Sequence, residues 1–304
     1  MRESYTPINE LGEFALIERM QGILGGTEAP DVLVGIADDA AVYRIADGRV
    51  HVVTTDALVE PIHFDRLFMP MEYLGFKALS VNVSDVVAMN ATPRFATITL
   101  GLPDNMSVEM VEALYRGLKN AAEAYHLTIL GGDTTAAPFL MLSVTVIGEA
   151  KEEDIVYRKG AKPGDVLCVT GDLGAAYAGL QVMLSQRRAL QEQGLDYQPD
   201  LTPYQYVIQR QLVPLARLQT VKDWASRGVR PHALIDISDG LASEVHHVCV
   251  QSGCGALIHT AALPIATETR DVADQLAEDV DTYALFGELI GHVARLGGDG
   301  ERCR

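Results

Sequence analysis

The sequence predicts an α/β (α+β) protein with two domains, and three observations lead to this fold class. The chain has 304 residues, which is enough for two domains of ordinary size. It is 48% hydrophobic and 21% charged, as expected of a globular protein with a substantial core. Short β-rich runs alternate with segments of helical periodicity, which is typical of an α/β chain.

The first half starts with a helical pattern from residue 9 to about residue 24, which Gly25-Gly26 ends. Strands and helices are then expected in turn. The predicted strands are residues 32–36, 50–54, 95–100 and 139–147. The predicted helices are residues 71–88 and a second one that begins after Ser107, a good N-cap residue.

The composition changes near residues 148–162, where a charged run precedes a tight turn at residues 158–165 that contains Pro163-Gly164. We therefore expect two domains, residues 1–150 and residues 151–304. The second should contain a strand at 166–169, helices at 173–184, 204–226 and 241–250, and a polar loop at 191–201.

The net charge of −17 and the pI of about 4.8 describe a strongly acidic protein. Such a field repels nucleic acid, so we expect no nucleic-acid partner. It also repels phosphorylated substrates unless metal ions lie between them and the carboxylates. The simpler interpretation is that the charge serves solubility alone.

The sequence also favours a cytoplasmic protein without a membrane partner. The four cysteines have no metal-binding or disulfide-framework spacing. The N-terminal stretch lacks the apolar core of a signal peptide. The longest apolar run, near residues 139–148, is too short to span a bilayer.

One pattern recurs, in which an apolar run leads to an aspartate, usually through a small residue. Mg²⁺ prefers such carboxylate oxygens, and neighbouring Gly, Ser and Thr allow phosphate groups to approach closely. In open α/β sheets, ligands gather at the carboxyl ends of strands. The aspartates in this pattern are Asp38 and Asp39, Asp56, Asp85, Asp133, and Asp236 with Asp239.

Each aspartate alone also has a simpler interpretation. Asp239 suits the N-cap of the following helix, and Asp38 is best interpreted as a turn or cap residue. Asp56 or Asp85 alone would be a solvated turn carboxylate, and Gly131-Gly132-Asp133 an ordinary turn. The run before Asp85, residues 79–84, fits a helix as well as a strand.

Other phosphate-binding and catalytic motifs are absent from the sequence. There is no P-loop and no dinucleotide-binding G-x-G-x-x-G after a strand. There is also no nucleophile elbow and no protein-kinase motif set. We therefore expect phosphate to be bound mainly through metal ions.

Six segments in order resemble the thiamine-monophosphate kinase family. They are GIADDAAV, TTDALVEPIHF, KALSVNVSDVVAMNATP, LGGDTT, YRKGAKPGD and IDISDGLASE. The family belongs to an ATP-binding superfamily with aminoimidazole ribonucleotide synthetase and selenophosphate synthetase. The resemblance covers about residues 12–286, which is nearly the whole chain. It implies an N-terminal α/β domain that dimerises, binds ATP and binds metal, and a C-terminal α/β domain beside it.

The resemblance implies the reaction of ATP with thiamine monophosphate to give ADP and thiamine diphosphate, assisted by several Mg²⁺ ions. The transfer would be direct and in line, with no side-chain nucleophile. His63 matches a substrate-binding position. The positions matching ATP contacts are Gly132, Asp133, Arg158 and Ser238. The positions matching metal ligands are Asp39, Thr54, Thr55, Asp56, Asp85, Asp133, Asp236 and Asp239.

Two departures from the family pattern qualify this expectation. Ala37 stands where the family usually has glycine, which adds one methyl group. After residue 286 the sequence leaves the family pattern, as a truncated or frame-shifted chain would. The resemblance implies that the part that differs would complete the second domain's sheet and help enclose the thiamine ring. Two alternatives remain, another ATP-dependent enzyme of the superfamily or an inactive nucleotide- and metal-binding protein.

Overall fold

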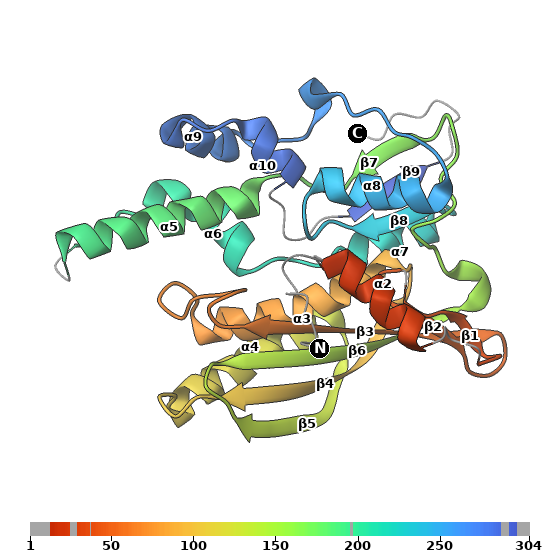
Figure 1. Cartoon of the computed structure of the whole chain (residues 1–304), viewed down its shortest axis with the longest axis horizontal. Helices are drawn as coiled ribbons and strands as arrows, with labels where there is room; N and C mark the ends of the chain where they lie inside the picture. The colour runs from red at the N-terminus through yellow and green to blue at the C-terminus, as the bar shows by residue number, and fades with distance from the viewer. Residues whose placement is uncertain (1–12, 25–28, 37, 195–196, 287–291, 297–304) are drawn as a thin grey trace, which may run out of the picture.

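Two β-sheets organise the chain, one in each half. The computed structural model describes residues 13–24, 29–36, 38–194, 197–286 and 292–296. A six-stranded sheet lies in the lower part of Figure 1, and a three-stranded sheet lies at the upper right. Among the described residues, no helix is both long and apolar enough to cross a membrane.

The first sheet has the strand order β1-β2-β3-β6-β4-β5. All neighbouring strands are antiparallel except β4 and β5, which run parallel. The strands are β1 (Val32–Val34), β2 (Ala41–Arg44), β3 (Arg49–Val59), β4 (Thr92–Leu102), β5 (Thr128–Ala136) and β6 (Met141–Lys151).

The second sheet has the order β7-β9-β8, and β9 is antiparallel to both neighbours. Its strands are β7 (Val166–Val169), β8 (Ala233–Asp236) and β9 (His292–Leu296). Because β7 and β8 both oppose β9, they run in the same direction and their carboxyl ends share one edge. Asp236 lies at that edge and meets Asp39 and Asp85 of the first half of the chain.

Nine described helices surround the sheets. They are α2 (Glu13–Leu24), α3 (Met71–Ala88), α4 (Val108–Tyr125), α5 (Ala175–Gln193), α6 (Gln205–Leu212), α7 (Leu218–Ser226), α8 (Leu241–Ser252), α9 (Thr267–Leu276) and α10 (Val280–Phe286). Short 3₁₀ turns cover Glu152–Asp154, Thr202–Tyr204 and Thr260–Ala262. The predicted N-cap of α4 is confirmed, since Ser107 Oγ accepts from the Met110 N–H at 3.3 Å.

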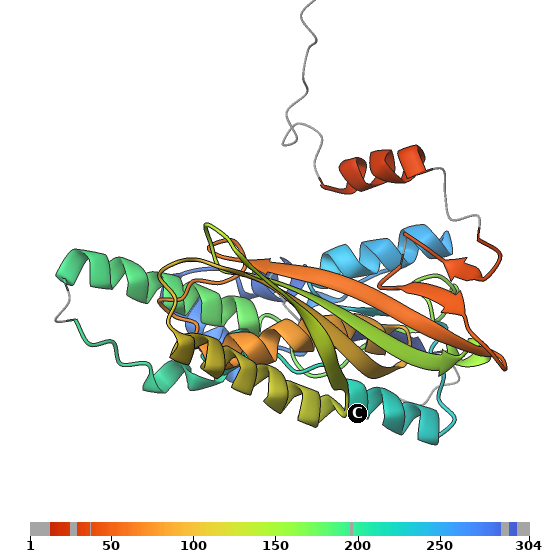
Figure 2. The same ribbon diagram turned by 90° about the horizontal axis from the view of Figure 1, so that it is seen from below.

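Helices α3 and α4 lie against one face of the first sheet (Figure 2) and cross each other closely. A Cβ atom on Gly75 would lie 2.1 Å from the Leu114 carbonyl oxygen. One on Gly117 would lie 1.8 Å from the Glu72 carbonyl oxygen. Because any larger residue would push the two helices apart, these glycines set the depth at which α3 packs.

Buried polar contacts join α3 and α4 to the connection between α6 and α7. Ser80 Oγ donates to the Pro214 carbonyl oxygen at 2.7 Å, and the Ala216 N–H donates to the Tyr125 hydroxyl at 3.0 Å. The Ser80 and Tyr125 hydroxyls also bond each other. The core under the first sheet continues into α7 through Val221, so the two halves share one packed interior.

Lys77 makes a further contact between the halves. Its ammonium group is buried and donates to the Gln211 carbonyl oxygen at 3.3 Å, near the end of α6. Burial lowers the pKa of Lys77 to about 8. A cation at a helix C-terminus offsets the negative end of the helix dipole, which accounts for a lysine in this interior.

Several predicted elements need correction. The run 79–84 before Asp85 is part of α3 and not a strand, so its helical interpretation is right. The predicted helix 204–226 is two helices, because Pro214 lacks an N–H and disfavours a helical Val213. Asp56 and Asp133 lie inside β3 and β5, which continue past them, and not beyond the strand ends.

Some predictions fall outside the described residues. These are the start of the first helix at residues 9–12, the Gly25-Gly26 turn and the Ala37 departure. Most of the predicted C-terminal departure also falls outside, at residues 287–291 and 297–304. Between these two segments, residues 292–296 form β9, the middle strand of the second sheet.

Candidate metal and nucleotide site

Three aspartates from distant parts of the chain meet between the two halves. Asp39 precedes β2, Asp85 lies in the last turn of α3, and Asp236 ends β8. One carboxylate oxygen from each lies within 4.8 Å of the others. Asp39 and Asp236 are buried and Asp85 is partly exposed. Three of the predicted metal ligands therefore come together.

Ser84 and Asp85, which are consecutive residues of α3, connect this helix to both halves of the site. Thr54 Oγ1, on β3, donates to Asp85 Oδ2 at 2.6 Å. Ser84 hydrogen-bonds the carboxylate of Asp236, across the junction. The packing depth of α3 therefore sets the distance between a ligand of the first half and a ligand of the second.

Arg158 and the Asp38-Asp39 pair form the other side of the site. The Arg158 side chain donates to Asp39 Oδ1 from Nε, at 3.0 Å, and from Nη2. Asp38 instead accepts the backbone N–H groups of Asp39, at 3.1 Å, and of Arg158, at 3.2 Å. The two adjacent carboxylates thus differ in role. Asp39 binds a guanidinium, whereas Asp38 binds backbone N–H groups, one of them 120 residues away in sequence, and not only its own turn.

The carboxylates disfavour one another's ionisation. Burial raises the pKa of Asp39 well above its ordinary value, and the negative charge of Asp236 raises it further despite Arg158. Burial and Asp236 likewise raise the pKa of Asp85 well above its ordinary value. Burial raises the pKa of Asp236 to about 7. Near neutral pH the site therefore favours either protons or a bound cation.

Arg158 does not neutralise the cluster. Burial alone would lower its pKa, but the charge and hydrogen bonds of Asp39 outweigh burial and keep the guanidinium positive. Asp39 Oδ2 is buried, and no described group donates a hydrogen bond to it. Three hard oxygen ligands, one of them otherwise unpartnered, and a net negative charge fit a divalent cation such as Mg²⁺.

The predicted ligands on β3 divide between the two faces of the sheet. Thr54 faces α3, as its bond to Asp85 shows. Asp56 as a whole residue is exposed, but its carboxyl group lies among protein atoms. Its backbone N–H donates to Asn82 Oδ1 at 3.0 Å. Thr55 points to the opposite face, where it donates to the Val144 carbonyl oxygen at 3.2 Å. The structure places Thr54 beside the cluster and Asp56 on the same face.

Gly132 and Asp133 are not part of this cluster. They lie on β5, at the edge of the sheet, and both are exposed. The register pairs Asp133 with Thr99 of β4, and it pairs Asp56 with the buried Val144 of β6. Asp133 thus belongs to the residues that face away from α3, three strands from β3.

His63 lies in the turn after β3 and is exposed. Its Nδ1 accepts the Val59 N–H at 3.1 Å, so the ring is held against the end of the strand. It is close enough to Asp56 for its charge to lower the pKa of that carboxyl, although burial raises the pKa more. The predicted substrate contact therefore borders the carboxylate site.

Ser238 and Asp239 follow β8 and lead into α8. The Asp239 N–H donates to Glu244 Oε1 at 3.2 Å. Glu244 is buried, and burial raises its pKa to about 7. Sequence reasoning missed Glu244 and Asn82, two residues that hold backbone at the site. For Glu244 the only signal was an acidic residue in the first turn of a helix after a Ser-Asp-Gly loop.

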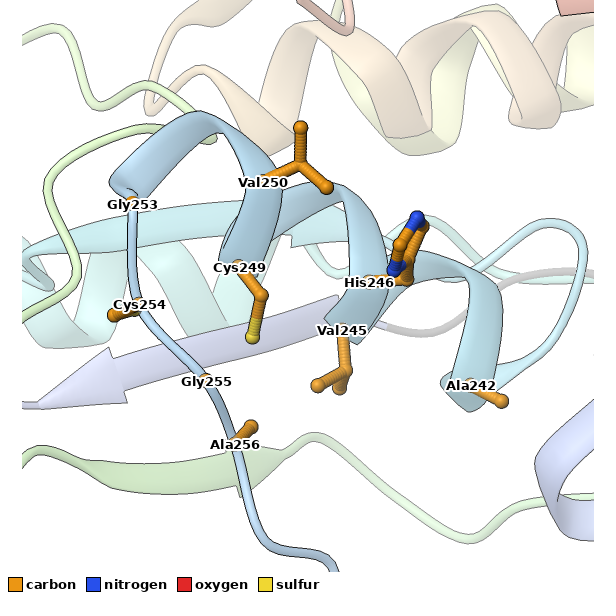
Figure 3. Close-up of a pocket in the computed structure, with 9 residues that line it drawn as sticks. All are labelled: Ala242, Val245, His246, Cys249, Val250, Gly253, Cys254, Gly255 and Ala256. Atoms are coloured by element: carbon orange, nitrogen blue, oxygen red, sulfur yellow. The ribbon is translucent and has the colours of Figure 1, made fainter.

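A groove of about 660 Å³ runs along α8, on the side of the helix that faces away from Glu244. Figure 3 shows that it is lined by small and apolar side chains, with His246 at its side. It contains none of the predicted ligands and no carboxylate, so it is separate from the acidic cluster.

Two family models match the chain. One, described as AIR synthase related protein, N-terminal domain, matches residues 37–150, and its C-terminal counterpart matches residues 162–291. The fold and the acidic site therefore define a two-domain protein of the AIR synthase-related class, and the predicted fold class is confirmed.

Relatives of known activity indicate one family within this class. The thiamine-monophosphate kinase of Aquifex aeolicus is 36% identical over 281 residues, which is 92% of this chain and 84% of that protein. The enzyme of Bacillus subtilis is 34% identical, over 86% of this chain and 78% of that protein. The solved structure described as AaThiL complexed with AMPPCP and TMP superposes with a TM-score of 0.83 at 34% identity, covering 96% and 87% of the two chains. The chain belongs to the thiamine-monophosphate kinase family, as its motifs predicted.

We predict that Mg²⁺ stabilises the protein more at higher pH. Unfolded carboxylates lose their protons near pH 4. In the folded protein Asp236 keeps its proton up to about pH 7, and the pKa values of Asp39 and Asp85 are also raised, so without metal the stability falls as the pH rises across this range. Because Mg²⁺ takes the place of these protons, saturating Mg²⁺ should raise Tm more at about pH 8 than at about pH 5.5.

Differential scanning fluorimetry at constant ionic strength measures this difference. Asp236→Asn should remove most of the extra stabilisation at high pH. The exposed Asp104→Asn is the matched control and should retain it. An equal Tm shift at both pH values in the unaltered protein would contradict the assignment.

Proposed function

We propose that this protein phosphorylates thiamine monophosphate with ATP to give thiamine diphosphate and ADP, as a cytoplasmic enzyme. The supporting observation is the cluster of Asp39, Asp85 and Asp236 at the junction of two AIR synthase-related domains. The names of the relatives and the AMPPCP and TMP complex of AaThiL support this substrate pair. We assign ATP binding, dimerisation and most of the metal ligands to the domain of residues 1–150. The domain of residues 151–304 adds Asp236 to the same cluster.

Asp39, Asp85 and Asp236 would hold Mg²⁺, with Thr54, Thr55, Asp56 and Asp239 as further proposed ligands. When bound, Mg²⁺ neutralises the charge that keeps two phosphorylated substrates apart. This proposal agrees with the acidic cluster, in which a single arginine faces several carboxylates.

The reaction places few demands on side-chain chemistry. A phosphate oxygen of thiamine monophosphate attacks the γ-phosphorus of ATP, and the bond from that phosphorus to the β–γ bridging oxygen breaks, so that ADP leaves. Because the attacking oxygen is already anionic near neutral pH, no general base is needed. The protein's task is to orient the phosphates and screen their charge. Arg158, which stays positive, is suited to an ATP phosphate.

Asp85→Asn should nearly abolish turnover while leaving the fold intact. The amide oxygen of asparagine can still accept the Thr54 hydroxyl, but the negative charge at the centre of the cluster is lost. We expect kcat/KM to fall by roughly a thousandfold, as when a key electrostatic group is removed from an active site. The measurement is formation of thiamine diphosphate with ATP and Mg²⁺.

The control for this variant is Asp104→Asn, an exposed loop position that should keep wild-type turnover. Circular dichroism spectra of both variants check the fold. Wild-type turnover by Asp85→Asn would refute the metal role, and absence of product from the unaltered protein would refute the proposed reaction.

We further propose a homodimer in which Asp133 and Gly132 complete the partner's site. Asp133 lies on the sheet face opposite Asp56 and three strand positions from β3. At the usual spacing between strands this separation is ~14 Å. The exposed Leu130 and Phe139 flank this edge, at 58% and 55% exposure, and offer an apolar contact. In the proposed dimer, Asp133 and Gly132 of one copy would therefore lie beside the Asp39, Asp85 and Asp236 cluster of the other copy.

Mixed dimers test this arrangement. An Asp85→Asn chain and an Asp133→Asn chain are each expected to be nearly inactive alone. Co-expressed, they should form heterodimers with one intact site, so activity should recover to about a quarter of the wild-type value for random pairing. Co-expression of Asp85→Asn with Asp39→Asn is the matched control and should recover nothing. No recovery in the first mixture would show that Asp133 acts within its own chain or not at all.

A further inference from the structure

Glu244 is a buried carboxylate that the proposed reaction does not yet use. It lies in the first turn of α8 with 3% of its surface exposed. A buried carboxylate is costly unless its oxygens are satisfied. Its Oε1 accepts the Asp239 N–H at 3.2 Å and lies 3.5 Å from the Ser238 hydroxyl. Glu244 thus reaches back over the start of its own helix to the loop that follows β8.

The direction of Glu244 on α8 supports a role at the site. At 100° per residue, Glu244 is about 150° around the helix from the groove-lining Cys249 and His246. It shares its side of α8 with the buried Leu241 and Val248. The glutamate therefore points into the protein, toward Arg158 and Asp39, which both affect its ionisation.

The loop that Glu244 holds is also confined on its other side. Gly240 has a φ of +105°, which side-chain-bearing residues rarely adopt. A Cβ atom there would lie 2.6 Å from the Leu285 carbonyl oxygen and 2.6 Å from the Phe286 Cα atom. The loop of residues 238–240 is therefore held between the end of α10 and the Glu244 carboxylate.

From this geometry we infer that Glu244 is a positioning residue for the nucleotide. It fixes the Ser238–Asp239 backbone so that the Ser238 hydroxyl and the Asp239 carboxylate are already in place when ATP and its metal ions bind. The inference rests on the proposed function, in which these two residues contact ATP and metal. A group ordered in advance does not have to be ordered during binding, so Glu244 contributes to nucleotide affinity without touching the nucleotide.

A purely structural interpretation makes a different prediction. If Glu244 only caps α8, its loss lowers Tm and leaves nucleotide affinity unchanged. If Glu244 positions the loop, its replacement weakens nucleotide binding. The weakening then depends on whether the new side chain has a hydrogen-bond acceptor and not on whether it has a charge. Glutamine keeps the acceptor oxygen and removes the charge, whereas leucine removes both.

The experiment measures the Kd of AMPPCP by calorimetry in the presence of Mg²⁺, together with KM for ATP and kcat. Glu244→Leu should weaken AMPPCP binding and raise KM for ATP by roughly tenfold or more, because the Asp239 N–H loses the acceptor that fixes the loop. Its kcat should change by only a few-fold. Glu244→Gln should restore the Kd to within about threefold of wild type. Glu268→Leu, at an exposed glutamate in the first turn of α9, is the matched control and should change neither value.

An AMPPCP Kd within twofold of wild type for Glu244→Leu would overturn the inference. Equal losses in Glu244→Leu and Glu244→Gln would also overturn it, because charge would then decide. If Glu244→Leu fails to fold, Glu244→Asp replaces it, since the shorter side chain withdraws the acceptor. Because calorimetry needs no turnover, failure of the proposed reaction in the unaltered protein would be seen separately, as absence of thiamine diphosphate.

Discussion

The repulsion among buried carboxylates is the constraint on which the rest of the structure depends. Asp39, Asp85 and Asp236 place their oxygens within 4.8 Å of one another, and only Arg158 supplies a compensating charge from the described residues. Such an arrangement is unfavourable unless protons or a cation occupy it. A protein that only needed to fold would gain by replacing these groups with apolar ones, so their presence supports a function for the cluster.

Helix α3 is the element that maintains this arrangement. It presents Asp85 to the site and Ser84 to Asp236, while its middle is tied to the α6–α7 connection through Ser80. Gly75 lets it pack against α4 without a gap. Since the core continues from the first sheet into α7, the two halves cannot separate without breaking buried contacts. The ligands of both halves are thereby held at a fixed spacing before any substrate arrives.

Much of the fold and most of the central site could be predicted from the sequence, for identifiable reasons. Helix 71–88 is long and rich in apolar residues, so its predicted bounds agree with α3. The sequence could not decide whether Asp85 follows a strand or lies on a helix, because a short apolar run fits both. It also could not show that Asp133 lies on the other face of the sheet, because strand order is a long-range property. The role of Glu244 could not be predicted from the sequence, because glutamates are common in the first turn of helices and its burial depends on tertiary packing.

The central claim is that Asp39, Asp85 and Asp236 bind one divalent cation together. The most direct test is an anomalous difference map from crystals of the protein grown with AMPPCP and with Mn²⁺ in place of Mg²⁺. A peak among the three carboxylates, with Asp39 Oδ2 as a ligand, is the predicted result. Ordered AMPPCP with no metal peak among these three side chains would contradict the claim.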